Sequence, residues 1–313
     1  MRITPEILEK QWGSIKYTDG GFLQIDTQHP LEWHIGYQSI RQRTLLLVSD
    51  TEIDAIDSSK SMRVTRRRRE SDNHWTLSFE LLRDEQHGVF ATLCCDIIEH
   101  SRPAANDKEA LKLVINRYKQ WSKLLETQRS GLMDEHSRKG LLGELLFLEK
   151  RIQTSNTAFE AVQGWSGAES ADQDFMYSDG WYEIKSIVAS APTVSISSLE
   201  QLDRTDSGKL VVMRIDKSAP ERTGAVSLYE VVQRIKDTIS TETQALDLFQ
   251  TKLMAYGYLD LLEYAEQKYM HSSTQHYGVD DSFPRLVKNN VPPQIVAVHY
   301  EINIASLVNW LKG

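Results

Sequence analysis

The stretch that decides the fold is residues 171–186, ADQDFMYSDGWYEIKS. Its Asp179-Gly180 pair is the strongest short signal for a β-hairpin, because a type I′ turn needs positive φ at both central residues. If this pair forms the loop, Ser178 lies opposite Trp181. The stretch therefore predicts two short antiparallel strands with a fixed pairing.

This pairing divides the hairpin into an apolar face and a charged face. Asp174 is expected opposite Lys185, and Met176 opposite Glu183. Because cross-strand partners share a face, as do alternate residues of a strand, Asp174, Glu183 and Lys185 come together on one side. The other side carries Phe175, Tyr177, Tyr182 and Ile184. A slip of one residue would move Asp174 to the wrong face.

Two carboxylates and a lysine on one face are suited to metal-assisted hydrolysis of a phosphodiester. The carboxylates suit Mg²⁺, with Mn²⁺ as a substitute, because hard cations prefer oxygen ligands. The backbone carbonyl of Ile184 is a further candidate ligand. Lys185 is expected to hold the attacking water or to stabilise the charged phosphate. The alternative is an ordinary solvated hairpin face on which Lys185 pairs with Asp174.

These residues resemble the PD-(D/E)xK nuclease superfamily. The matching features are Asp174, the triplet Glu183-Ile184-Lys185 and an upstream Glu144 in the helical segment GLLGELLFLEK. The order of a helix, a strand, a hairpin strand, and then VSISSLEQLD leading into a helix resembles the superfamily's αβββαβ core. Residue 173 is Gln, where the namesake pattern has Pro.

More narrowly, GLLGELLFL, EIKS and SSLEQLD resemble a bacterial family of PD-(D/E)xK motif proteins. Members of that family tend to be encoded beside DNA methyltransferases and helicase-type ATPases in phage-defence loci. The resemblance implies a Mg²⁺-dependent DNA endonuclease of a restriction or defence system, with such an ATPase and methyltransferase as partners. Because superfamily members often dimerise to cut both strands, it also implies a homodimer.

The resemblance also implies roles for three residues outside the hairpin. Glu144 would bind the metal directly or through water, although a surface acid on the polar side of its helix is the alternative. Gln201, with Ser197, would lie near the active site and the DNA backbone. Capping of a helix by Ser197 or Ser198 accounts for the same residues equally well.

Two other functions remain open. A nuclease-like fold can persist as a catalytically inert subunit that binds DNA or assembles a larger complex, and the same chemistry can act on RNA. The chain has 36 Lys and Arg against 44 Asp and Glu, a net charge of −8. This balance gives no general attraction to nucleic acid and favours dependence on a partner.

In so acidic a chain, contact with phosphates requires a local basic patch. The best candidate is the run of four consecutive arginines, Arg66, Arg67, Arg68 and Arg69. Such a run can neutralise DNA phosphates. It can equally be an edge strand that uses charge to prevent aggregation.

The length of 313 residues predicts about two domains. The pattern of helices and strands along the chain, together with the resemblance, implies an α/β (α+β) fold. Residues 1–105 form a β-rich N-terminal domain in this interpretation, and residues 106–225 a connecting helix and the nuclease core. Residues 226–313 form a mainly helical C-terminal region. Within these, the patterns predict strands over 43–49, 61–69, 73–84, 87–98 and 293–304, and helices over 228–239, 243–256, 259–269 and 305–312.

The same sequence excludes several classes of protein. No apolar run is long enough to span a membrane, and the N-terminus lacks the apolar segment of a secretory signal. The two cysteines, Cys94 and Cys95, are adjacent in a predicted strand and point to opposite faces, so they are not expected to form a disulfide. We therefore expect a cytoplasmic protein.

Overall fold

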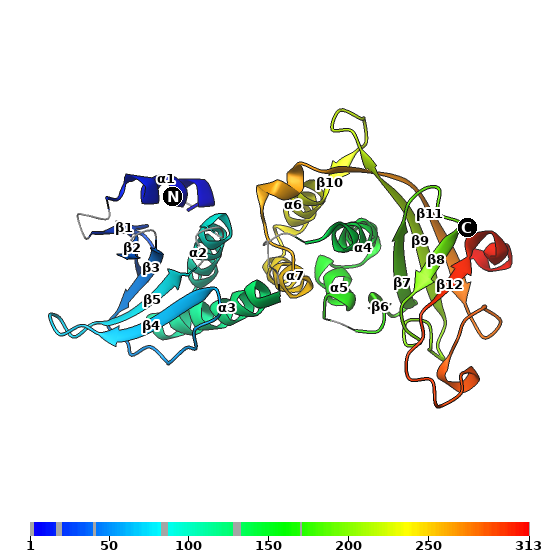
Figure 1. The fold of residues 1–313 in the computed structure, drawn as a ribbon, viewed down its shortest axis with the longest axis horizontal. Coiled ribbons are helices and arrows are strands. Elements are labelled where there is room, and N and C mark those ends of the chain that lie inside the picture. Colours follow the sequence, from blue (N-terminus) through cyan, green and yellow to red (C-terminus); the bar gives the residue numbers. More distant parts are fainter. Residues whose placement is uncertain are drawn as a thin grey trace. The chain divides into compact units, whose positions relative to one another are not determined.

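The computed structural model describes residues 3–16, 21–39, 42–82, 87–127, 133–169 and 171–312. Contacts within the chain divide it into two compact units, Met1–Leu132 and Met133–Gly313 (Figure 1). The division differs from the expected boundary at residue 105. The helix expected to join the nuclease core belongs to the first unit, and residues 226–313 belong to the same unit as the predicted core.

In its described residues, the first unit contains a five-stranded antiparallel sheet and three helices. The sheet has the order β1-β2-β3-β5-β4. Alternate residues such as Trp33, Ile35, Leu45 and Leu47 are fully buried, as expected for a sheet with one covered face. The elements are α1 (Pro5–Ser14), β1 (Phe22–Ile25), β2 (Glu32–Ser39), β3 (Gln42–Ser49), β4 (Met62–Arg68), β5 (Trp75–Leu81), α2 (His87–Ser101) and α3 (Asp107–Thr127).

One prediction in this unit is wrong. Residues 87–98, expected as the second strand of a hairpin, form most of helix α2. Phe90, Leu93, Cys94 and Ile97 are all buried, and their spacing is that of one helix face. A short apolar run fits a buried helix as well as a buried strand, which explains the error. Cys94 and Cys95 are both buried free thiols.

The second unit is built on a mixed sheet of the order β10-β11-β9-β7-β6, with β13 paired to β11. Strand β7 runs parallel to β9 and antiparallel to β6. Its strands are β6 (Phe175–Tyr177), β7 (Gly180–Ile187), β8 (Thr193–Ile196), β9 (Gly208–Ser218), β10 (Val226–Ser227), β11 (Lys268–Val279), β12 (Tyr300–Asn303) and β13 (Leu311–Lys312). Its helices are α4 (Glu135–Thr154), α5 (Ala158–Gln163), α6 (Leu228–Ile239) and α7 (Thr243–Tyr256), with 3₁₀ turns at Gly167–Glu169, Leu262–Ala265, Lys288–Asn290 and Ile304–Trp310.

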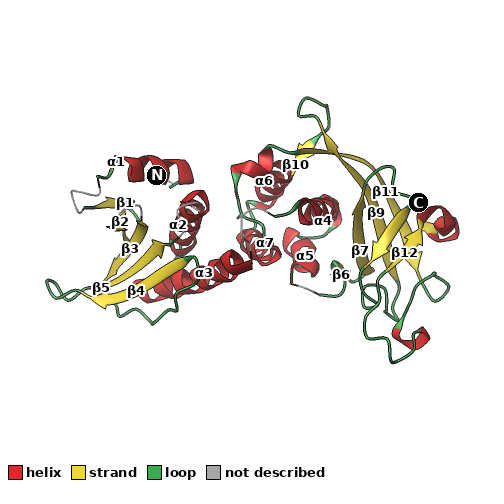
Figure 2. Cartoon of the chain, in the orientation of Figure 1, coloured by secondary structure: helices red, strands yellow, loops and turns green. Residues whose placement is uncertain are grey.

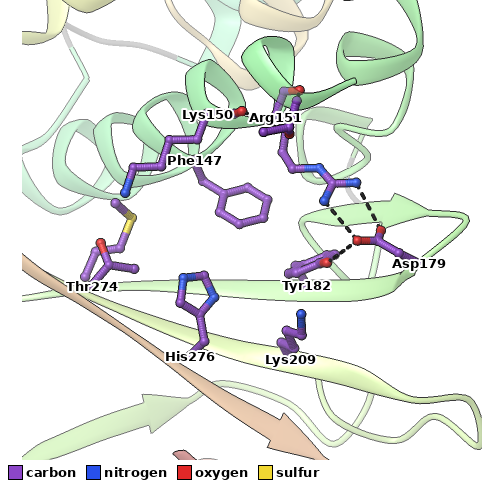
Figure 3. Close-up of a pocket in the computed structure, with 10 residues that line it drawn as sticks. Phe147, Lys150, Arg151, Asp179, Tyr182, Lys209, Thr274 and His276 are labelled. Carbon is purple, nitrogen blue, oxygen red and sulfur yellow. Dashed lines mark hydrogen bonds and ion pairs between the residues drawn. The ribbon is translucent and has the colours of Figure 1, made fainter. Parts of the chain in front are cut away.

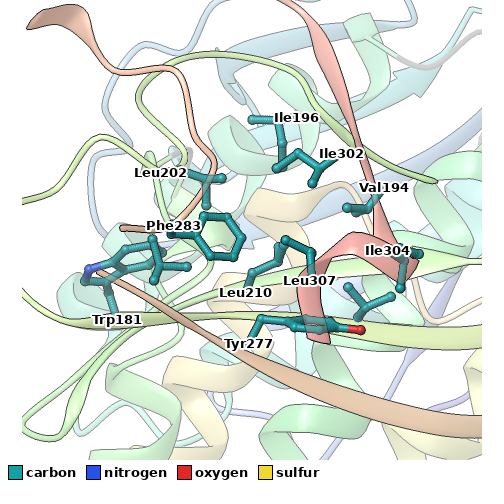
Figure 4. Packing of buried hydrophobic residues seen from close by; sticks show 12 residues of the cluster. Trp181, Val194, Ile196, Leu202, Leu210, Tyr277, Phe283, Ile302, Ile304 and Leu307 are labelled. Carbon is teal, nitrogen blue, oxygen red and sulfur yellow. The ribbon is translucent and has the colours of Figure 1, made fainter. Parts of the chain in front are cut away.

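Two different layers cover the faces of this sheet. Helices α4 to α7 lie on one side, and the β8–β12 pair lies on the other (Figure 2). A buried apolar cluster joins the sheet to that pair, with Trp181 and Leu210 packed with Ile196 and Ile302 (Figure 4). Because alternate residues of a strand point to opposite faces, the neighbour of Trp181, Tyr182, faces α4.

Two of the C-terminal elements form as predicted, and the others differ. The helices predicted over 228–239 and 243–256 are confirmed as α6 and α7. The helix predicted over 259–269 is wrong, because only a 3₁₀ turn forms before β11 begins at Lys268. The helix predicted over 305–312 is a 3₁₀ helix followed by β13, and only the end of the strand predicted over 293–304 forms, as β12.

The helix expected after VSIS is also wrong. The described residues between β8 and β9 form turns, with Leu202 N–H donating to the carbonyl of Leu199. After these turns the sequence DRTDSG has no apolar residue that could continue a helical face. The fold is thus a mixed α/β structure. None of the helices in the described ranges combines the length and apolar composition needed to cross a bilayer.

Candidate active site

The hairpin of β6 and β7 forms as predicted, but with its pairing shifted by two residues. Tyr177 pairs with Gly180, and Phe175 with Tyr182 rather than Ile184. The loop is therefore Ser178-Asp179, and only Gly180 has positive φ, at 126°. A shift of two residues preserves the alternation of faces, so the charged and apolar sides predicted for the hairpin remain as they were.

Asp174 immediately precedes β6. Both its backbone and its side chain accept hydrogen bonds from neighbouring segments. Its backbone carbonyl accepts from the N–H groups of Ser166 and Gly167, each at 2.9 Å. Its side-chain Oδ2 accepts from the N–H of Ile184 at 2.7 Å. Since the N–H and C=O of one strand residue point to the same edge, the Ile184 carbonyl also faces this edge.

Glu183 and Lys185 form an ion pair on the same face. Lys185 Nζ lies 2.9 Å from Glu183 Oε1, so Lys185 pairs with Glu183 and not with Asp174. The Glu183 side chain is only 2% exposed, and its Oε2 is buried without a hydrogen-bond partner among the described residues. A buried carboxylate oxygen of this kind is normally occupied by a proton or a cation.

Gln201 joins this group from the turn after β8. Its Oε1 accepts from Lys185 Nζ at 3.0 Å and from the backbone N–H of Ser197 at 2.9 Å. The structure therefore places Gln201 against Lys185, with the backbone of Ser197 bonded to the same amide oxygen. Ser197 caps no helix, because the residues that follow it form turns.

Glu144 reaches the site from α4 and is 5% exposed. Its Oε2 accepts from Trp165 Nε1 at 2.7 Å, and its Oε1 accepts from the Tyr256 hydroxyl at 2.8 Å. Glu144 is thus a buried, hydrogen-bonded carboxylate rather than a surface acid. Since both oxygens already accept hydrogen bonds, a contact between Glu144 and a metal is better made through water.

Gly167 keeps space open beside the carboxylates of Asp174 and Glu144. A Cβ atom at this position would lie 2.8 Å from Asp174 Oδ1 and 3.2 Å from Glu144 Oε2. The absence of a side chain therefore leaves room beside both carboxylates. This open space is where an ion or water could meet Asp174 Oδ1.

The electrostatics of the three acids reflect their burial. Burial raises the pKa of Asp174 to about 6, although the Ile184 N–H and Lys185 oppose the rise. Burial and repulsion from Asp174 raise the pKa of Glu183 to about 8. Burial, followed by repulsion from Asp174, raises the pKa of Glu144 well above its usual range. A bound cation would relieve this repulsion.

The donor set fits a hard divalent metal held by few protein ligands. Within the described ranges, no three His, Cys, Asp or Glu side chains gather closely enough to hold an ion by themselves. Asp174 and Glu183 supply oxygens on one face, and the Ile184 carbonyl faces the same edge. Mg²⁺ commonly binds through one or two carboxylates and retains several waters.

Three partners of this site did not emerge from the sequence. Trp165 and Tyr256 both donate hydrogen bonds to Glu144. Lys252, 3% exposed, donates to the carbonyls of Gln163 and Trp165 and pairs with Glu169 at 3.2 Å. Lys252 and Tyr256 are four residues apart on α7, and this spacing is the signal in the sequence that they share one helix face.

The four arginines lie in the first unit, on and just after the edge strand β4. Arg66 lies 3.7 Å from Glu52 and 4.7 Å from the Trp75 ring, and Arg69 forms an ion pair with Asp72. Arg67 and Arg68 are exposed. The edge position agrees with the aggregation-preventing alternative, and the internal pairs offset part of the positive charge.

Residues 8–305 match the family described as "Putative PD-(D/E)XK family member, (DUF4420)". No curated protein matches the chain, and neither does any solved structure.

Proposed function

Since the chain belongs to this PD-(D/E)XK family, we propose that it is a Mg²⁺-dependent DNA endonuclease of a bacterial restriction or phage-defence system. In this proposal α4, β6, β7 and β9 correspond to the nuclease core. The protein acts in the cytoplasm, as a homodimer, together with a helicase-type ATPase and a DNA methyltransferase. The net charge of −8 supports dependence on such partners for access to DNA.

The observation that carries the proposal is the carboxylate of Glu183. Its Oε1 pairs with Lys185, while its Oε2 is buried with no hydrogen-bond partner among the described residues. Burial, followed by repulsion from Asp174, raises its pKa. A solvated hairpin face would leave both oxygens in water. A buried carboxylate oxygen without a partner, beside a second carboxylate, is costly unless a cation compensates the charge, as expected for a metal ligand.

Asp174, Glu183 and the Ile184 carbonyl would hold the metal, and Glu144 would hold one of its waters. A bound Mg²⁺ supplies charge to polarise the phosphate and to acidify a water molecule. Lys185 orients the attacking water and stabilises the negative charge that develops on the phosphate. Gln201 restricts Lys185 to one position through its 3.0 Å hydrogen bond. The exposed arginines of β4 would contact the DNA backbone.

Cleavage of plasmid DNA with Mg²⁺ or Mn²⁺ tests this proposal. The wild-type protein should nick or linearise the plasmid, and Lys185→Met should reduce the rate by at least about a hundredfold, as for loss of a group that stabilises transition-state charge. The matched control is Lys268→Met, because Glu266-Gln267-Lys268 is a second E-x-K triplet whose lysine pairs with Glu230. The control should cleave like the wild type.

Cleavage by Lys185→Met at the wild-type rate would refute the assignment. If the wild type does not cleave, a helicase-type ATPase and a DNA methyltransferase, the proposed partners, are added and the assay is repeated. Inactivity in the complete mixture would favour an inert subunit. Cleavage of RNA but not DNA would change the substrate class and leave the site unchanged.

A further inference from the structure

A second candidate site lies on the opposite face of the sheet. A cavity of about 250 Å³, here called the α4 pocket, opens between α4 and strands β7, β9 and β11 (Figure 3). Tyr182 lines it and packs against Phe147 of α4, with ring centroids 5.0 Å apart. Glu183 and Lys185 point to the other face of β7, so the α4 pocket is separate from the candidate active site. Its lining is Phe147, Lys150, Arg151, Thr154, Asp179, Tyr182, Lys209, Met213, Thr274 and His276.

Positive charge surrounds this pocket in an otherwise acidic chain. Among its lining residues, the one carboxylate, Asp179, is already engaged by Arg151 at 3.0 Å through both oxygens and by the Tyr182 hydroxyl at 2.7 Å. No carboxylate in the described part of the chain forms an ion pair with Lys150 or Lys209. Two lysines therefore face the pocket with uncompensated charge.

The two ammonium groups approach the pocket from different elements. Figure 3 shows Lys150 extending from α4 and Lys209 rising from β9, with His276 of β11 between them. Burial lowers the pKa of His276, and the charges of Lys209 and Lys150 lower it further, which is consistent with both lysines being close to the imidazole. The hydroxyl of Thr274 also lines the pocket on β11, where it lies 2.8 Å from Nε2 of His271.

The remainder of the wall is aromatic and apolar. Tyr182 and Met213 are buried, and Lys209 Nζ lies 5.4 Å from the Tyr182 ring. Uncompensated cations beside an aromatic wall suit a ligand that joins an anion to a planar ring. A phosphate has more acceptor oxygens than a carboxylate, so it can accept hydrogen bonds from donors on several elements at once.

We propose that the α4 pocket binds a small phosphorylated ligand of the nucleoside monophosphate class. Lys150, Lys209 and Thr274 bind its phosphate, and Tyr182 lies beside its base. This site is independent of the proposed nuclease activity, because it lies on the other face of the sheet and requires no metal.

Calorimetric titration of the full-length protein with AMP and with inorganic phosphate, in the presence of EDTA, tests this proposal. The wild type should bind both, and AMP more tightly. Lys150→Met and Lys209→Met should each weaken binding by at least about tenfold, as for loss of a charged hydrogen bond. The matched control is Lys217→Met, because Lys217 is also on β9 but pairs with Glu135 at 3.3 Å. The control should bind like the wild type.

Three outcomes would overturn the proposal. They are no binding of either ligand at 10 mM (about the weakest affinity of interest), equal weakening by Lys217→Met, and displacement of AMP by a short DNA duplex. The last result would make the pocket a contact for nucleic acid rather than for a small ligand. Since EDTA removes divalent ions, failure here is independent of failure of the nuclease assignment.

Discussion

At the scale of single residues, two features define the candidate site: a buried carboxylate oxygen of Glu183 and the missing side chain of Gly167. Glu183 Oε2 is buried and accepts no hydrogen bond from the part of the chain that the structure describes, and Gly167 leaves space beside Asp174 and Glu144. The sequence identified Asp174, Glu183 and Lys185 because alternation in a strand is local. It did not indicate the space at Gly167, because that depends on a turn folded against two other elements.

Gly167→Ala should damage the site more than the fold. Its methyl group would lie 2.8 Å from Asp174 Oδ1, so the carboxylate must move. We expect metal affinity to fall by about 10- to 100-fold, as for other changes that misplace a ligand. Gly13→Ala, in α1 with no atom within 4 Å of the added carbon, is the control and should leave metal binding unchanged. Wild-type affinity in Gly167→Ala would show that the space has no role.

His29 should make the stability of the first unit depend on pH. Its Nδ1 accepts from Leu31 N–H at 2.9 Å and lies 3.2 Å from Trp33 Nε1, and its Nε2 lies 2.9 Å from the carbonyl of Ile98. Burial lowers its pKa in the folded state, and Arg102 lowers it further, against the raising effects of the Ile98 and Leu31 carbonyls and of Asp26. Because the folded pKa is below the unfolded value of about 6.5, this contribution to stability is present above that pH and is lost as pH falls.

We therefore expect hydrogen exchange in β2 and α2 to accelerate as pH is lowered from 7.5 to 5, after correction for intrinsic rates. The free energy of opening should fall by up to about 1.4 kcal/mol per pH unit. His29→Gln should be less stable at pH 7.5 and show a smaller pH dependence. An equal pH dependence in the variant would assign the effect to other groups.

At the scale of elements, the hairpin shows how a sequence prediction can be wrong in register and correct in its chemistry. The pairing moved by two residues, which left Glu183 and Lys185 on one face of β7. The Asp174 carboxylate lies at the adjacent strand edge, where it accepts from the N–H of Ile184. Helix α2 shows the opposite case, because an apolar run without clear alternation was assigned to the wrong element. The contribution of α7 could not be predicted, since Tyr256 is 112 residues from its partner Glu144.

Lys252 of α7 should stabilise the segment that holds Trp165 and Gly167. Lys252→Met would leave the buried carbonyl of Trp165 without this donor, and an unsatisfied buried group costs about 1–3 kcal/mol. We expect the free energy of unfolding of the second unit to fall by about that amount in urea denaturation. Lys217→Met, which removes an exposed pair, should change it by less than about 1 kcal/mol. Equal losses in both variants would contradict a supporting role for Lys252.

At the scale of the whole molecule, the chain combines two compact units and a net negative charge. The hairpin, Glu144 and Gln201 all belong to the second unit, and the arginine run belongs to the first. Mixed α/β architecture and family membership were predictable from the sequence, because local strand and helix patterns suffice for the first and short motifs for the second. The boundary after residue 132 was not predictable from the sequence. The periodic apolar residues of α3 predict a buried helix face, but they do not show that this face packs within the first unit.

The most direct test of the central claim is the binding of Mn²⁺ measured by electron paramagnetic resonance, which needs no DNA and no partner protein. The wild type should bind Mn²⁺, and Asp174→Asn and Glu183→Gln should each lose that binding. Glu266→Gln, from the second E-x-K triplet, is the control and should bind like the wild type. Undiminished binding in Asp174→Asn and Glu183→Gln would contradict the assignment of these carboxylates as the metal site.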